Sequence, residues 1–181
     1  MDVYHVVTER PMYVGQQILF DEDHRSGVYH RVQAKLDIVK EIYANPSCYD
    51  PETLEHHTSV ALRELALEEV RLAKYPQYPS RMGCLYVSGT LQEAEQWGDF
   101  FAGIGRPTYH IVRLAVEGNC FRGDATKCFR GLTDRGENLR LASLYWEKGY
   151  DGTGICEMLV DGKITVSEIV KEINANLPED M

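Results

Sequence analysis

Apolar and polar residues alternate in several short stretches of the chain, which is the pattern of half-buried β-strands. Strands are expected over residues 3–8, 15–20, 108–116 and 155–160, and residues 84–97 are expected to form a short strand, a tight turn and a capped helix. Because the strands are short and the segments between them differ in length, the pattern predicts an α+β fold rather than a doubly wound α/β fold.

Helical spacing of apolar residues governs the region between the second and third expected strands. One stripe runs over residues 28–43 and is stopped by the Asn45-Pro46 dipeptide. A second helix is expected to begin with Asp50 as its N-cap and Pro51 at its first helical position, and to run to about Lys74. Residues 28–74 are therefore interpreted as an α-helical insertion within one domain that spans residues 1–181.

Three later segments complete the predicted element order. Residues 120–136 are interpreted as a glycine-rich loop, and residues 137–149 as a helix. The Asp161-Gly162 turn ends the strand that is expected over residues 155–160. Residues 166–174 are expected to form a helix, or a strand followed by a helix. The prediction leaves both alternatives open for this last segment.

Composition and charge narrow the classes of partner and compartment. The 181 residues carry a formal charge of −9 and contain no run of Lys or Arg, which disfavours a nucleic-acid partner or an anionic membrane. The five cysteines form no C-x-x-C pair and the histidines show no metal-ligand spacing, so we expect reduced thiols and no metal. Without a signal pattern or a membrane-length apolar run, the expected localisation is cytoplasmic.

One chemically reactive type of side chain interrupts each of three separate strands. These are His5 in "VYHVV", Tyr86 in "CLYVS" and Glu157 in "ICEMLV". Each alone is most often structural: a satisfied histidine, a packed tyrosine or a solvated glutamate. Glu157 carries the most information, because an unpaired carboxylate buried in an apolar strand costs several kcal/mol, so it should face a cleft or a partner.

Together and in this order, three segments resemble the motifs of the ADP-ribosyltransferase fold: "YHVVT", "CLYVSGTLQEAEQW" and "CEMLVDGKITV". The His-Tyr-Glu combination resembles that of diphtheria toxin, the poly(ADP-ribose) polymerases and the small bacterial enzymes that modify rifamycins. The whole sequence also resembles an uncharacterised bacterial domain family without an assigned activity. The resemblance implies two small antiparallel sheets around an NAD cleft.

The resemblance also implies roles for individual residues. Glu157 would stabilise the positive charge that develops on the ribose when the nicotinamide bond breaks, and would act as a base toward the acceptor. His5 would hold the adenosine-side ribose, and Tyr86 would stack on the nicotinamide ring. Trp97 would supply a second aromatic wall, with core packing as its equal alternative, and Ser88 would be a polar contact of the same pocket.

The resemblance also implicates positions that depart from the family pattern, and others that are weaker candidates for site residues. Val6 stands where the first motif has a glycine, so its backbone would have to serve there, and Thr8 ends the same motif. Arg81 is the candidate for the NAD pyrophosphate, with Arg106 and Arg113 available as well. The alternative for all three arginines is an ordinary solvated charge. Asp124 is a further candidate, for an acceptor site.

The functional hypothesis that follows from the resemblance is an NAD-dependent mono-ADP-ribosyltransferase that releases nicotinamide. Its substrate would be NAD, and its acceptor an unidentified small molecule or protein. The alternative is a catalytically inactive module on the same fold that binds a nucleotide or another protein. Val6 is the residue that favours this alternative.

Overall fold

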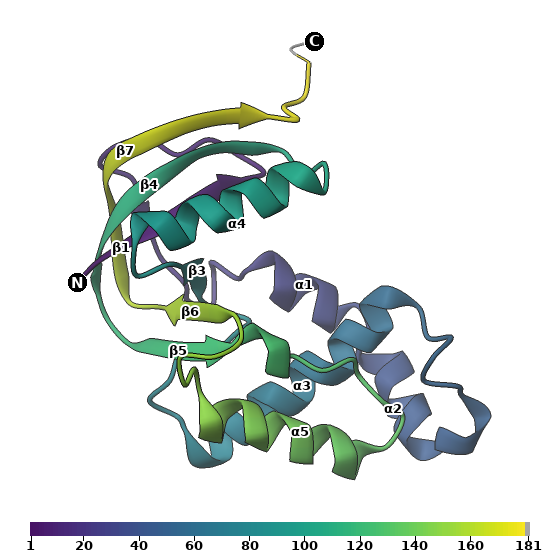
Figure 1. The fold of residues 1–181 in the computed structure, drawn as a ribbon. Coiled ribbons are helices and arrows are strands. Elements are labelled where there is room, and N and C mark those ends of the chain that lie inside the picture. Colours follow the sequence, from purple (N-terminus) through teal and green to yellow (C-terminus); the bar gives the residue numbers. More distant parts are fainter. Residues whose placement is uncertain (180–181) are drawn as a thin grey trace. The chain divides into compact units, whose positions relative to one another are not determined.

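A computed structural model describes residues 1–179, and it divides the chain into two compact units (Figure 1). The first unit comprises Met1–Leu19, Leu85–Asn119 and the chain from Val160 onward. The second comprises Phe20–Cys84 and Cys120–Leu159. The chain is of the α+β class, as predicted: it contains five α-helices within the described residues and two antiparallel sheets. No helix in that part of the chain is long and apolar enough to cross a membrane.

A four-stranded antiparallel sheet forms the body of the first unit. Its strand order is β1 (Asp2–Thr8), β4 (Thr108–Glu117), β7 (Lys163–Ala175) and β2 (Gln17–Ile18). The pairing of β4 with β7 contains three register shifts, and the two long strands curve together in Figure 1. Irregularities of this kind bend a strand and increase its twist, which explains the curl of the sheet.

Helix α4 (Leu91–Gly103) covers one face of this sheet and follows β3 (Leu85–Val87). The predicted capping box is present: the Glu93 amide donates to Thr90 Oγ1 at 3.2 Å, and Glu93 Oε2 accepts from the Gly89 amide at 3.2 Å. The helix packs on Val6 and Ile111 of the sheet. This contact defines which face of β1 is filled by core residues.

Most helices belong to the second unit. They are α1 (Gly27–Gln33), α2 (Leu36–Ala44), α3 (His56–Lys74) and α5 (Arg135–Lys148), with short 3-10 turns at Pro46–Cys48 and Ala125–Lys127. Strands β5 (Cys120–Asp124) and β6 (Cys156–Val160) are neighbours in the second sheet. Helix α3 packs against both α1 and α5, so it is the central helix of this unit.

Gly131 fixes the segment that leads into α5. A Cβ atom at this position would lie 2.2 Å from the backbone oxygen of Ser59 and 2.7 Å from the Cβ of Leu62, both in α3. Because a backbone atom cannot move aside as a flexible side chain can, the close approach requires glycine. The segment after the 3-10 turn is therefore held directly against α3.

The boundaries of the helical region differ from the prediction. The stripe over residues 28–43 is divided between α1 and α2, because Lys35 takes a φ of −111° and interrupts the helix. Val32 and Val39 nevertheless belong to one hydrophobic cluster, which is why the apolar spacing continues across the break. Helix α3 begins at His56 with Glu55 as its N-cap, and Asp50 instead accepts the Glu52 amide in a preceding turn.

Two other expectations were wrong. Residues 120–136 are not a continuous loop, since β5 and a 3-10 turn occupy Cys120–Lys127. The final segment is one long strand, β7, and contains no helix within the described residues. Its apolar residues are spaced irregularly, and the pairing with β4 absorbs that irregularity through its register shifts.

Candidate functional site

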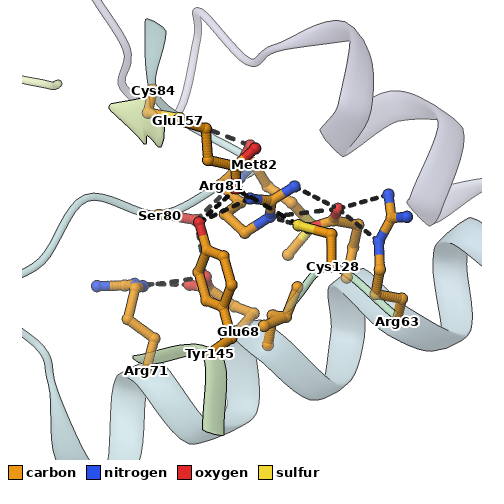
Figure 2. A network of polar contacts seen from close by, with 12 residues as sticks. Arg63, Glu68, Arg71, Ser80, Arg81, Met82, Cys84, Cys128, Tyr145 and Glu157 are labelled. Atoms are coloured by element: carbon orange, nitrogen blue, oxygen red, sulfur yellow. Dashed lines mark hydrogen bonds and ion pairs between the residues drawn. The ribbon is translucent and has the colours of Figure 1, made fainter. Parts of the chain in front are cut away.

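The carboxylate of Glu157 lies in a dense polar network of the second unit (Figure 2). The residue is on β6, and its side chain retains 13% of its exposure. Three groups converge on its Oε1 atom: the Tyr145 hydroxyl at 2.5 Å, the Cys128 thiol at 3.4 Å and Nη1 of Arg81. The sequence-based expectation that this carboxylate would have a partner is confirmed.

Arg81 is the centre of the network and is only 6% exposed. Its Nε atom donates to Glu64 Oε2 at 2.9 Å, and its Nη2 atom donates to Glu64 Oε1 at 3.2 Å. Its Nη1 atom reaches both Glu157 and the hydroxyl of Tyr145, the latter at 2.9 Å. One guanidinium therefore joins two carboxylates, so its interpretation as a solvated charge was wrong.

Glu64 completes the network from α3, where it is 2% exposed. Its Oε1 atom also accepts from Nε and Nη2 of Arg63, at 3.1 and 3.0 Å. Burial alone would raise the pKa of Glu64, but the charges and hydrogen bonds of Arg81 and Arg63 outweigh it and lower that pKa. The charges of two carboxylates thus balance those of two guanidiniums in a region with little access to water. The carboxylates are those of Glu64 and Glu157, and the guanidiniums are those of Arg63 and Arg81.

The two uncharged donors to Glu157 stay protonated. Burial raises the pKa of Tyr145 well above its ordinary value, and burial raises the pKa of the Cys128 thiol to about 12. Both groups can therefore donate a proton in a hydrogen bond to the carboxylate near neutral pH. The raised pKa disfavours the thiolate form of Cys128, which is the nucleophilic form.

In the first unit, His5 and Tyr86 are brought together. Nδ1 of His5 lies 2.7 Å from the backbone oxygen of Tyr86. Burial lowers the pKa of His5 to about 4, although the hydrogen bond to Tyr86 opposes the shift. The neutral imidazole then carries its hydrogen on Nδ1, since a carbonyl oxygen only accepts, and Nε2 is left as an acceptor.

The lowered pKa of His5 predicts a specific dependence of stability on pH. Between pH 6.5 and about 4 the unfolded chain binds a proton at this position and the folded chain does not, so stability is lost as the pH falls through this window. We expect His5→Gln to remove part of this loss, about 1 kcal/mol per pH unit, because glutamine can still donate to the Tyr86 carbonyl. Urea unfolding of the wild-type protein and of His5→Gln at pH 7, 6, 5 and 4 measures the free energy of unfolding at each pH. Parallel pH profiles would contradict the prediction.

Trp97 is partly buried and packs against the hydrophobic cluster beneath α4. It packs in the cluster of α4 with Val6 and Phe101, and its ring stacks on Phe101 with centroids 5.8 Å apart. Since successive side chains of a strand point to opposite faces, Val6 and His5 lie on opposite faces of β1. This packing agrees with the core alternative for Trp97, and its role as a second aromatic wall beside Tyr86 stays a prediction.

The remaining candidates of the first unit have backbone or core roles. Ser88 is buried; its backbone amide donates to the Tyr4 oxygen at 2.7 Å, and its backbone oxygen accepts from the Tyr4 amide at 2.9 Å. The Val6 side chain is 8% exposed and fills the space beneath α4. Thr8 lies at the end of β1, paired with Thr108.

Of the other charged candidates, Asp124 has a structural role. Its Oδ1 atom accepts from the amide and hydroxyl of Thr126, at 2.9 and 2.6 Å, and from the Ile155 amide at 3.3 Å. It therefore holds the turn after β5 and is only 4% exposed. Arg106 and Arg113 form exposed ion pairs with Glu9 and Glu168, respectively, as solvated charges do.

Four members of the Glu157 network were missed by sequence reasoning, namely Arg63, Glu64, Cys128 and Tyr145. The signal for Glu64 was present: it stands between Ala61-Leu62 and Ala66-Leu67 in a helix whose apolar positions already indicated burial on more than one side. A carboxylate in such a position needs a cation. No local pattern indicated which arginine would supply it.

Comparison with protein families gives one match. The model of the family described as "Protein of unknown function (DUF2441)" matches residues 3–172. No curated protein matches the chain.

Proposed function

Because the chain belongs to this family of unknown function, its activity has to be inferred from its own residues, and we propose that it is an NAD-dependent mono-ADP-ribosyltransferase. The observation that supports the proposal most is the state of Glu157. This carboxylate stands in an apolar strand, is fixed by three donors on one oxygen and keeps part of its side chain exposed. A fixed charge of this kind is pre-organised for a cationic transition state.

In this proposal, the two oxygens of Glu157 have different tasks. Oε1 is held by Arg81, Tyr145 and Cys128. Oε2 is then the oxygen that would accept a hydrogen bond from a ribose hydroxyl, and its charge would stabilise the oxocarbenium-like ribose as nicotinamide leaves. Glu157 would also take the proton of the incoming nucleophile.

Within the first unit, His5 and Tyr86 offer groups that suit parts of NAD by themselves. The neutral imidazole of His5 offers its Nε2 atom as an acceptor for a ribose hydroxyl. The hydrogen bond from His5 Nδ1 to the Tyr86 backbone oxygen fixes the orientation of the imidazole ring. The Tyr86 ring would stack on nicotinamide, which it attracts by about 0.5–2 kcal/mol while the ring is cationic. The cofactor is NAD, consumed as a substrate, and the acceptor is a small molecule or a protein.

The proposal is tested by the release of nicotinamide from NAD. We expect the wild-type protein to release nicotinamide, by hydrolysis or in the presence of acceptor extracts, and Glu157→Gln to be about a hundredfold slower, because the charge beside the ribose is lost. Chromatographic quantification of nicotinamide gives the rate. Glu117→Gln removes an exposed carboxylate and serves as the matched control. Absence of both NAD binding and nicotinamide release in the folded wild-type protein would refute the proposal.

A catalytically inactive nucleotide-binding module is the second candidate, and one observation favours it. Arg81 forms an ion pair with Glu157, the carboxylate that turnover would require. Calorimetric titration with NAD separates the two candidates. Binding that is weakened by His5→Gln, together with no release of nicotinamide, would support the inactive module.

A further inference from the structure

A cavity of about 470 Å³ lies beside the first turns of α3, within the second unit. Its walls come from the start of that helix and from the segment after the 3-10 turn, which Gly131 holds against α3. Cys128 forms part of the wall and also contacts Glu157. The volume is in the range of pockets that hold small organic ligands.

The permanently charged residues that line this cavity are the two arginines Arg63 and Arg130. Arg63, Arg130 and His56 contribute to the walls, and no Asp or Glu is among the residues described as lining it. This is unusual for a chain with a formal charge of −9. Two carboxylates adjoin the lining residues in sequence, and both have partners. Glu55 accepts the amides of His57 and Thr58 and pairs with Lys35. Glu64 pairs with Arg81 as well as with Arg63.

Both arginines are oriented by the protein itself. Arg63 donates two hydrogen bonds to the buried Glu64 and keeps 23% of its side-chain exposure. Arg130 is exposed, and its Nη2 atom donates to the backbone oxygen of Glu52 at 2.9 Å. A guanidinium has five N–H donors, so each arginine retains donors beyond these bonds. Pre-oriented guanidiniums are suited to phosphate oxygens, which they bind in a planar, two-bond geometry.

The rest of the wall is apolar. Leu54, Val60 and Phe129 line the cavity together with the hydroxyl-bearing Ser59. Such a wall offers apolar contacts to an organic group and leaves its charged end to the arginines.

We propose that this cavity binds a small organic phosphate monoester, with the phosphate between Arg63 and Arg130 and the organic part against Phe129. His56 would add a further hydrogen bond at the rim. The inference rests on the residues of the cavity alone and holds whether or not the chain acts on NAD.

Titration with phenyl phosphate tests the proposal on the full chain. Amide chemical shifts in a ¹⁵N-labelled sample report the site, and we expect saturable shifts concentrated in residues 54–63 and 128–131. Phenol carries the same ring without the charge and should cause no comparable shifts. Saturable binding of phenol as tight as that of phenyl phosphate, or shifts confined to other regions, would overturn the proposal.

Matched variants identify the cations that bind the probe. Arg130→Gln should weaken binding of phenyl phosphate by about tenfold, because a charge-assisted pair of hydrogen bonds is lost. Arg140→Gln removes an equally exposed arginine of the same unit, paired only on the surface with Glu137, and should leave the affinity unchanged. His56→Gln should have a smaller effect than Arg130→Gln. Equal affinities of Arg130→Gln and Arg140→Gln would show non-specific attraction and overturn the assignment.

Discussion

Replacement of Arg81 by leucine is expected to lower the free energy of unfolding by about 3–5 kcal/mol. The substitution removes the cation that two carboxylates share and leaves Glu64, 2% exposed, with Arg63 as its remaining partner. A buried carboxylate that loses a guanidinium keeps its desolvation cost without the compensating attraction. Urea unfolding followed by circular dichroism measures the change.

Two further variants decide whether the loss comes from the network. Arg140→Leu removes an exposed cation and should change stability by less than about 0.5 kcal/mol. The double variant Arg81→Leu/Glu64→Gln should recover part of the loss, because the unpaired charge is removed as well. A cost below about 1 kcal/mol for Arg81→Leu would contradict the central place that we give this residue.

The second large effect is expected for Trp146→Ala, which should also cost about 3–5 kcal/mol. The Trp146 side chain is 2% exposed, and its ring packs against Phe121 and Tyr78, with centroids 4.8 and 6.0 Å away. Its Nε1 atom donates to the backbone oxygen of Leu67 at 2.9 Å, which joins α5 to α3. The alanine variant would leave a cavity and remove the hydrogen bond that Trp146 donates to Leu67 between the two helices.

Trp97→Ala is the matched comparison, because Trp97 is only partly buried at the side of its cluster. Its loss of stability should be clearly smaller than that of Trp146→Ala when both are measured by the same denaturant titration. Equal losses would mean that Trp146, between α3 and α5, contributes no more to the free energy of unfolding than the partly buried Trp97 on α4.

The elements that depend on local patterns were predictable from the sequence. Strand β4 and helix α5 lie within a few residues of the predicted ranges, and the cap of α4 by Thr90 is confirmed. The elements that depend on distant partners were not. Strand β7 shows no clean alternation, and its extended form results from its pairing with β4 along ten residues of that strand.

The same distinction applies to the candidate site. The sequence indicated Glu157 because a carboxylate in an apolar strand needs a partner, and the structure contains one. The identity of that partner could not be predicted, because Arg81 is 76 residues away and carries no local sign of burial. Trp97 packs on the face of β1 opposite to His5, because side chains alternate along that strand, and this alternation was predicted. The sequence did not predict that α4 would pack on the face of β1 that carries Val6.

The guanidinium of Arg81 presents separate edges to its two carboxylates, and this has a consequence for how Glu157 could be made available. Nε and Nη2 hold Glu64, whereas only Nη1 holds Glu157. A rotation of the Glu157 side chain would break one contact of Arg81 and leave the other edge anchored. Under the proposed function, the cationic ribose would replace Arg81 as the counter-ion of Glu157, while Arg81 would keep its contacts with Glu64.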